Sequence, residues 1–227
     1  MEKKVVLKKR IKLFSILLLL VVILLVYLLI KVLLGIRIKN IFILNNNYLK
    51  DDYIIEKAKL TDYPSYFKNF SFTIENRLED DVFIKSANVS KSFFGVINIE
   101  VEENKALFYK ENDGKYVLED KSEVDSLPYQ KSLTRIVNYI PDTIYDNFIK
   151  KYSLLDDDIK SKISQVKYDP SEYDEARFML YMTDGNYVYA TLTKFDSINY
   201  YNEIYPTLGN KKGILYLDSG NHFQEIE

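Results

Sequence analysis

The chain has 227 residues, a formal net charge of −2, one histidine and no cysteine. The absence of cysteine excludes disulfide bonds and thiolate metal sites. Residues 13–227 contain 25 Lys and Arg against 32 Asp and Glu, and a surface that acidic argues against nucleic acid as a partner.

The N-terminal region contains one long apolar run from Leu13 to Leu34, with Lys31 as its single charged residue. A helix rises about 1.5 Å per residue, so this run would span roughly 33 Å, the thickness of a bilayer's hydrocarbon core. A buried helix of a soluble domain would be shorter and amphipathic. A cleaved signal peptide would have a shorter apolar region and a small-x-small cleavage site, which residues 31–37 do not provide. We therefore predict an uncleaved transmembrane signal anchor at residues 13–34.

The head of the chain, residues 1–12, contains six Lys and Arg but a single acidic residue. Positive charge beside the first membrane helix keeps that side in the cytoplasm. We therefore predict a cytoplasmic N-terminus and an extracytoplasmic C-terminus. About 190 residues follow the helix, enough for one large or two small domains.

The first stretch after the membrane helix begins with a strand pattern. Residues Ile36–Leu44 alternate β-branched and polar side chains, which is typical of a half-buried strand. Asn45–Asn47 suits a turn, because Asn tolerates positive φ. Apolar residues then recur at helical spacing as far as Ala58, with Asp51 and Asp52 placed to complement the helix dipole.

Pro64 separates this helix from a second helical stretch, Phe70–Leu78. Two alternating segments follow, Ile84–Ser92 and Val96–Glu102, and the turn at residues 92–95 would join them as a hairpin. The predicted order is β-α-α-β-β.

These elements carry two motifs that resemble a POTRA domain. The motifs are Ile41-x-Ile43-x-Asn45-Asn46-x-x-Leu49 with Ile54 at the opening, and Ile99-x-Val101-x-Glu103-x-x-Ala106 at the close. A single membrane helix followed directly by such a domain resembles the FtsQ/DivIB family of bacterial division proteins. Asn45 replaces the family's glycine and can adopt the same left-handed conformation, and Lys105 replaces a proline. The resemblance implies a POTRA domain at residues 36–105.

The remaining residues, 106–227, have a pattern rich in strands. Residues 106–109 and 116–118 flank Asn112-Asp113-Gly114, a strong hairpin turn. Leu127-Pro128 marks a bend. Pro141 opens a helix, and a short helical turn at 159–163 follows.

The last third of the chain has the clearest alternation. Phe178, Leu180 and Met182 would lie on the same face of a strand, and Val188, Ala190 and Leu192 on that of its antiparallel neighbour. A helical stripe at Phe195, Ile198, Tyr201 and Ile204 should end near Gly209, before a final strand at residues 213–217. We therefore expect an α+β ectodomain that ends in an antiparallel β domain with flanking helices.

This segment is similar to the β domain of the same family, whose last strand lies on an open sheet edge. The resemblance implies that extracytoplasmic tails of FtsB/DivIC and FtsL proteins add to that edge by β-augmentation. The alternative is that the aromatic residues there only pack against a helix of their own domain. The candidate partner-binding residues are Ile214, Tyr216, Leu217, Asp218, Ser219, Gly220 and Phe223.

No segment predicts catalysis, metal binding or a cofactor. Asp218-Ser219-Gly220 resembles an aspartic-protease motif, but that site needs two carboxylates and bracing strands, so a strand-ending turn is the better interpretation. His222 has no Cys or second His to share a metal, which favours a surface residue. Asp156–Asp158 fits a helix start better than a calcium loop. A chain with seven glycines shows no phosphate-binding loop, and we expect no small-molecule substrate.

We therefore expect a non-enzymatic, single-pass scaffold of the division machinery, concentrated at the septum of the bacterial cell membrane, which helps to regulate septal peptidoglycan synthesis. One alternative is a POTRA-bearing protein of outer-membrane assembly or secretion, but such proteins carry a long β-barrel and no barrel-length set of strands is predicted. The other is a membrane-tethered aspartic-type protease.

Overall fold

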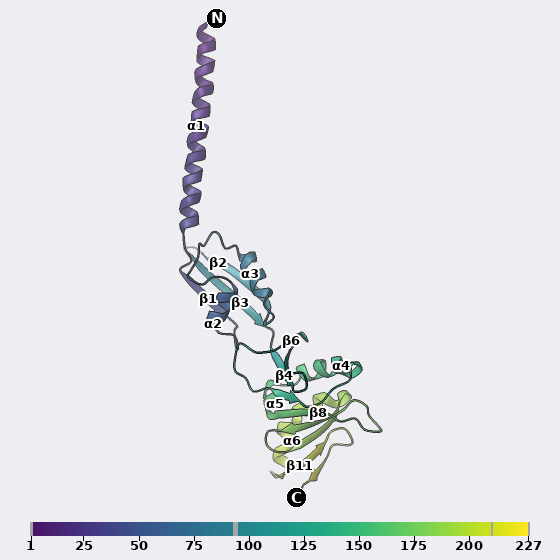
Figure 1. Ribbon diagram of the computed structural model, residues 1–227. Coiled ribbons are helices and arrows are strands. Elements are labelled where there is room, and N and C mark those ends of the chain that lie inside the picture. Colours follow the sequence, from purple (N-terminus) through teal and green to yellow (C-terminus); the bar gives the residue numbers. More distant parts are fainter. Residues whose placement is uncertain (1, 93–94, 210, 227) are drawn as a thin grey trace. The chain divides into compact units, whose positions relative to one another are not determined.

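The computed structural model describes residues 2–92, 95–209 and 211–226, and the chain divides into two compact units, Met1–Glu103 and Asn104–Glu227 (Figure 1). The first unit begins with helix α1, Glu2–Gly35. Within α1, Phe14–Gly35 is long and apolar enough to cross a membrane, and none of this window is buried inside the protein.

A small three-stranded sheet with two helices follows α1. Its strands are β1 (Asn40–Leu44), β2 (Ile84–Ser92) and β3 (Val96–Glu103), and its helices are α2 (Asp51–Lys57) and α3 (Ser71–Glu79). In the described residues the strands lie in the order β1-β3-β2, with β1 parallel and β2 antiparallel to β3. The predicted β-α-α-β-β order is confirmed.

Local backbone geometry explains where β1 begins and ends. Asn45 has a φ of 66°, as predicted for the turn after the strand. The strand begins at Asn40 rather than at residue 36, because the Ile38 N–H donates to the Pro64 carbonyl (2.9 Å) instead of joining the ladder. Two residues of the predicted turn at 92–95 lie outside the described part of the chain.

The described residues of the second unit form a nine-stranded sheet in the order β12-β11-β10-β9-β8-β7-β4-β5-β6. The strands are β4 Ala106–Lys110, β5 Lys115–Leu118, β6 Glu123–Val124, β7 Thr134–Ile136, β8 Ile163–Tyr168, β9 Arg177–Met182, β10 Tyr187–Thr191, β11 Gly213–Tyr216 and β12 His222–Glu225. Three neighbouring pairs are parallel: β4 with β7, β7 with β8, and β10 with β11. The sheet is therefore mixed rather than purely antiparallel, because intervening elements let the chain cross over between parallel strands.

The described residues of this unit also form four helical segments: α4 (Asp142–Ser153), α5 (Asp157–Lys162), the 3-10 helix η1 (Leu192–Tyr200) and α6 (Tyr201–Thr207). One continuous α-helix was expected from residue 195 to 209, but its first part is a 3-10 helix. The stripe of Phe195, Ile198 and Tyr201 is still buried, because a spacing of three residues matches the three residues per turn of that helix.

The core of the second unit lies between one face of the sheet and these helices. The predicted inward residues of β9 and β10 are buried there, among them Phe178, Leu180, Val188 and Ala190. They belong to the same cluster as Phe148 of α4. The opposite face of these strands carries the alternate side chains, which are only half-buried.

Candidate functional site

The far end of the large sheet is formed by a strand that the sequence patterns did not predict. Residues 213–217 were expected to be the last strand, but β11 is paired on both sides, with β10 and with β12. A tight turn makes this possible, with φ values of 97° at Gly220 and 53° at Asn221. In the described part of the chain, β12 has no strand on its other side.

The backbone of β12 presents unpaired groups along this edge. The Ile226 N–H donates to the Lys212 carbonyl (3.0 Å), which continues the antiparallel ladder with β11. In such a ladder alternate residues bond to the same neighbour. The N–H and C=O groups of Phe223 and Glu225 therefore face away from β11, where an added strand would bind them.

A row of stacked side chains crosses the outer face of the sheet and ends on β12. The Arg177 guanidinium lies 4.3 Å from the Tyr189 ring centre. Tyr189 stacks on Tyr216 (5.4 Å between centroids), and Tyr216 stacks on His222 (4.5 Å, rings 7° apart). His222 is exposed, so the row has an open end at the sheet edge.

The opposite face holds β12 against the core. Phe223 packs on the core cluster. A Cβ atom at Gly213 would lie 2.1 Å from the Gln224 carbonyl oxygen and 2.6 Å from the Phe223 ring. Only glycine therefore allows β12 to approach β11 this closely.

The predicted binding residues divide into three groups. Ile214, Tyr216 and Phe223 lie half-buried on β11 and β12. Leu217 is a buried core residue, and Asp218 is held in place by Arg177 (3.6 Å between Oδ2 and Nη1).

Ser219 and Gly220 form the turn between β11 and β12, where the Ser219 hydroxyl donates to Asp218 Oδ1 (3.0 Å). No sequence pattern placed Arg177, Tyr189 or His222 at this surface. The alternation around Tyr189 indicated that its side chain faces away from the core, but no local pattern showed which strands lie side by side.

Asp169, in the loop after β8, anchors Arg177 of β9. Its carboxylate accepts hydrogen bonds from Lys167 Nζ and Arg177 Nη2, both at 2.9 Å. The Lys167 bond, aided by the charges of Lys167 and Arg177, outweighs partial burial and lowers the pKa of Asp169. The guanidinium is thereby fixed at the inner end of the stacked row.

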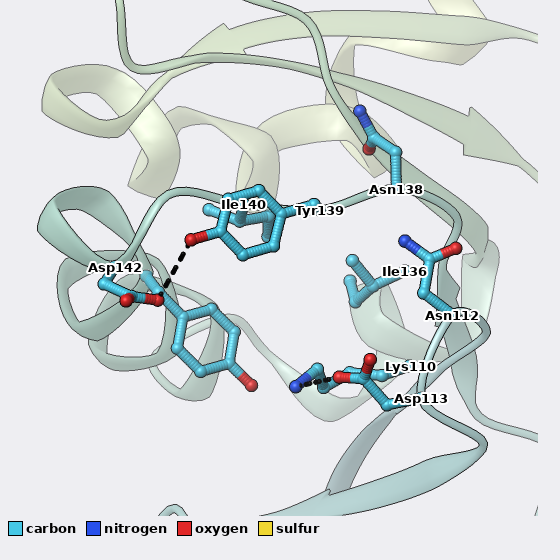
Figure 2. A pocket seen from close by; sticks show the side chains of 9 residues that line it. Lys110, Asn112, Asp113, Ile136, Asn138, Tyr139, Ile140 and Asp142 are labelled. Carbon is cyan, nitrogen blue, oxygen red and sulfur yellow. Dashed lines mark hydrogen bonds and ion pairs between the residues drawn. The ribbon is translucent and has the colours of Figure 1, made fainter.

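A separate cavity of about 150 Å³ lies beside the start of α4 (Figure 2). It is lined by Lys110, Asn112, Asp113, Ile136, Asn138, Tyr139, Ile140, Asp142 and Tyr145. Burial opposes the charge of Lys110, but hydrogen bonds to Asp113 and Glu123 outweigh it and raise the pKa of Lys110. Burial raises the pKa of Tyr145 to about 12. Both groups keep their protons near neutral pH and offer hydrogen-bond donors rather than nucleophiles.

Within the described residues, no group of three or more His, Asp or Glu side chains is placed to hold a metal ion.

Comparison with known proteins agrees with the resemblance found in the sequence. The family model for the POTRA domain, FtsQ-type, matches residues 36–104.

Cell division protein DivIB of Bacillus subtilis is 34% identical over 67% of this chain and 60% of its own length. The protein of the same name from Bacillus cytotoxicus is 28% identical over 84% of this chain and 77% of its own, and that from Listeria monocytogenes is 31% identical over 66% and 58%. The chain thus spans less than two thirds of the Bacillus subtilis and Listeria relatives.

A solved structure, the major extracytoplasmic domain of DivIB from Geobacillus stearothermophilus in its trans isomer, covers 48% of this chain and 97% of its own, with 20% identity and a TM-score of 0.37. The family model, the curated relatives and the N-terminal apolar helix agree. The chain belongs to the FtsQ/DivIB family of bacterial cell division proteins.

Proposed function

We propose that this chain is a non-enzymatic scaffold of the division machinery and that it binds an extracytoplasmic partner by adding a strand to β12. The observation that carries this proposal is the free edge of β12, where the backbone groups of Phe223 and Glu225 face outward. The relatives named cell division protein DivIB support the division role. The family resemblance points to the tails of FtsB/DivIC and FtsL proteins as partners.

The proposed topology places residues 1–12 in the cytoplasm and both folded units outside the membrane. The basic head supports this orientation. In this arrangement the scaffold holds its partners at the division septum and so helps to regulate septal peptidoglycan synthesis. Binding a partner requires a surface and no reactive group. The charged side chains beside β12 fit this role, because Arg177 is paired with Asp169 and Asp218.

Two other edge strands, β2 and β6, are less suited to adding a strand. The outward N–H groups of β2 at Ala87 and Val89 already donate to Glu79 and Glu75, at 3.1 and 2.7 Å. The edge strand β6 has two residues, too few for a ladder. The edge of β12 combines unpaired backbone with an adjacent aromatic row, which favours it over both.

The stacked row suggests how the partner's register is set. A strand added to β12 would place one side chain beside His222, at the open end of the row. Cross-strand neighbours of this kind are stabilised by aromatic stacking or by a cation–π contact. We expect the partner residue at this position to be aromatic or Arg.

The test compares two substitutions at one position in residues 36–227, with a peptide from the partner's C-terminal tail as ligand. Glu225→Pro removes an outward N–H and leaves the bonds to β11, whereas Glu225→Ala keeps that N–H and removes only the ion pair with Lys211. Loss of one backbone hydrogen bond of about 1.4 kcal/mol lowers affinity about tenfold. The proline variant should therefore bind about tenfold more weakly than the alanine variant.

Tyr216→Lys, which interrupts the stacked row, should also weaken binding while leaving the circular dichroism spectrum unchanged. Equal affinity of the wild type and the Pro, Ala and Lys variants would exclude strand addition at β12. If the isolated tail does not bind the wild type, the same series is repeated with the assembled FtsL complex, and failure there too would overturn the proposal.

A further inference from the structure

The connection between α2 and α3 carries aromatic side chains that the domain does not bury. Tyr63, Phe67 and Phe70 are 47%, 38% and 56% exposed. They alternate with inward residues, since Tyr66 and Asn69 are buried. Three large rings on one short connection form an outward apolar group that needs an explanation.

This connection is tied to the end of the membrane helix. The Ser65 hydroxyl donates to the Leu34 carbonyl (2.6 Å), and the Tyr66 N–H donates to the Ile36 carbonyl (2.8 Å). The apolar window of α1 ends at Gly35. The segment that carries the rings is therefore held at the level where α1 leaves the hydrocarbon.

The lengths involved bring Tyr63 and Phe67 within reach of the lipid interface. The headgroup layer adds about 5 to 7 Å on each side of the hydrocarbon core. Tyr63 and Phe67 are two residues from Ser65, so their Cα atoms lie within about 7 Å of it. Rings of ordinary size reach the headgroup layer from there.

The inward residues hold the connection in a fixed shape. The Tyr66 hydroxyl donates to the Ser92 carbonyl (2.6 Å), and the Lys91 ammonium lies 3.9 Å from the centre of the Tyr66 ring. The Asn69 amide donates to the Ser65 carbonyl (2.9 Å) and accepts from Arg77 (3.1 Å). The segment that carries the exposed rings is therefore already ordered, so little conformational entropy is lost when the rings bind.

We propose that Tyr63, Phe67 and Phe70 form a lipid-binding surface, here called the aromatic foot, which inserts into the headgroup layer beside α1. Amphipathic and aromatic rings are favoured in that layer. The exposed ammonium of Lys68, between two of the rings, can reach lipid phosphates. The foot rests on the proposed membrane crossing of α1 and is independent of partner binding at β12. It would fix the orientation of the first folded unit on the membrane.

The sequence contains no tryptophan, so a single introduced Trp reports one position without background. The full chain is reconstituted in two sets of vesicles of phosphatidylcholine and phosphatidylglycerol, one with lipids brominated close to the headgroup and one, for Tyr27, with lipids brominated deep in the acyl chains. Phe67→Trp and Phe70→Trp probe the foot. Tyr173→Trp, at a loop position that is 97% exposed in the other unit, is the matched control, and Tyr27→Trp reports α1 itself.

We expect Trp at position 67 or 70 to be quenched several-fold more than at 173, with emission shifted to shorter wavelength, while circular dichroism matches the wild type. If Trp at positions 67 and 70 is quenched no more strongly than at 173 while Tyr27→Trp is quenched, the proposal of the aromatic foot is wrong, and the membrane crossing of α1 still holds. If Tyr27→Trp is not quenched either, the membrane crossing fails and the foot fails with it. Tail binding by the same variants tests the β12 proposal separately.

Discussion

At the scale of single residues, Glu103 explains why the two POTRA motifs occur together. Its buried carboxylate accepts the backbone N–H groups of Asn47, Tyr48 and Leu49, at 3.1, 3.0 and 2.7 Å. The closing motif thus supplies the acceptor for the turn in the opening motif. Sequence spacing predicted both motifs, but this contact became visible only when β3 was placed beside β1.

The first prediction concerns this carboxylate. Glu103→Ala leaves buried N–H groups without an acceptor and should cost about 3 kcal/mol of unfolding free energy in the first unit. Hydrogen exchange of amides in residues 36–103 measures the change. Glu102→Gln is the control, because the neighbouring carboxylate is exposed and pairs with an exposed Lys85, and surface pairs contribute little. Similar effects of both substitutions would contradict the role given to Glu103.

Asp169 gives a prediction with a pH dependence. The pKa of Asp169 is lowered in the folded protein. The ionised side chain therefore stabilises the fold at pH values above its pKa in the unfolded chain, which is about 3.9. This contribution is lost as the pH falls through the pKa of Asp169 in the folded protein. Asp169→Asn should therefore destabilise the second unit at pH 7, and the difference from the wild type should shrink below about pH 3.9. Urea unfolding at both pH values measures it, with Glu172→Gln in the same loop as control. A difference that stays constant with pH would contradict the assignment.

At the scale of elements, strands with regular alternation were predicted well and short strands were not. The inward residues of β9 and β10 are buried as their alternation indicated. β12, with the sequence His-Phe-Gln-Glu, has one apolar residue and no alternation to detect. Its formation depends on the turn at Gly220 and on the close approach at Gly213, and both are tertiary features.

Gly213→Ala tests how β12 is held. The added methyl group meets the Gln224 carbonyl, so β12 should separate from β11 while the core strands remain folded. We expect faster hydrogen exchange at residues 222–226 and a loss of partner affinity of about tenfold or more, since a displaced strand offers no ordered edge. Both measurements are made on the full chain with Gly35→Ala as the control, because a Cβ there meets nothing within 4 Å. Unchanged exchange in β12 would contradict the packing argument.

At the scale of the whole molecule, local patterns predicted the N-terminal apolar helix, the order of elements in the first unit and the family. They did not predict the strand order of the large sheet, where β4 lies beside β7 and β11 lies between β10 and β12. Such pairings join segments far apart in the chain, and periodicity carries no information about them. The position of the free edge, and hence of the candidate site, followed from that order.

The most direct measurement is residue-resolved hydrogen exchange of residues 36–227 with and without the partner's tail. Strand addition predicts that the Phe223 and Glu225 amides, which face away from β11, exchange slowly only in the complex. The His222 and Gln224 amides should change less, since they face β11 in both states. Binding that leaves the Phe223 and Glu225 amides unchanged and slows exchange elsewhere would contradict the account.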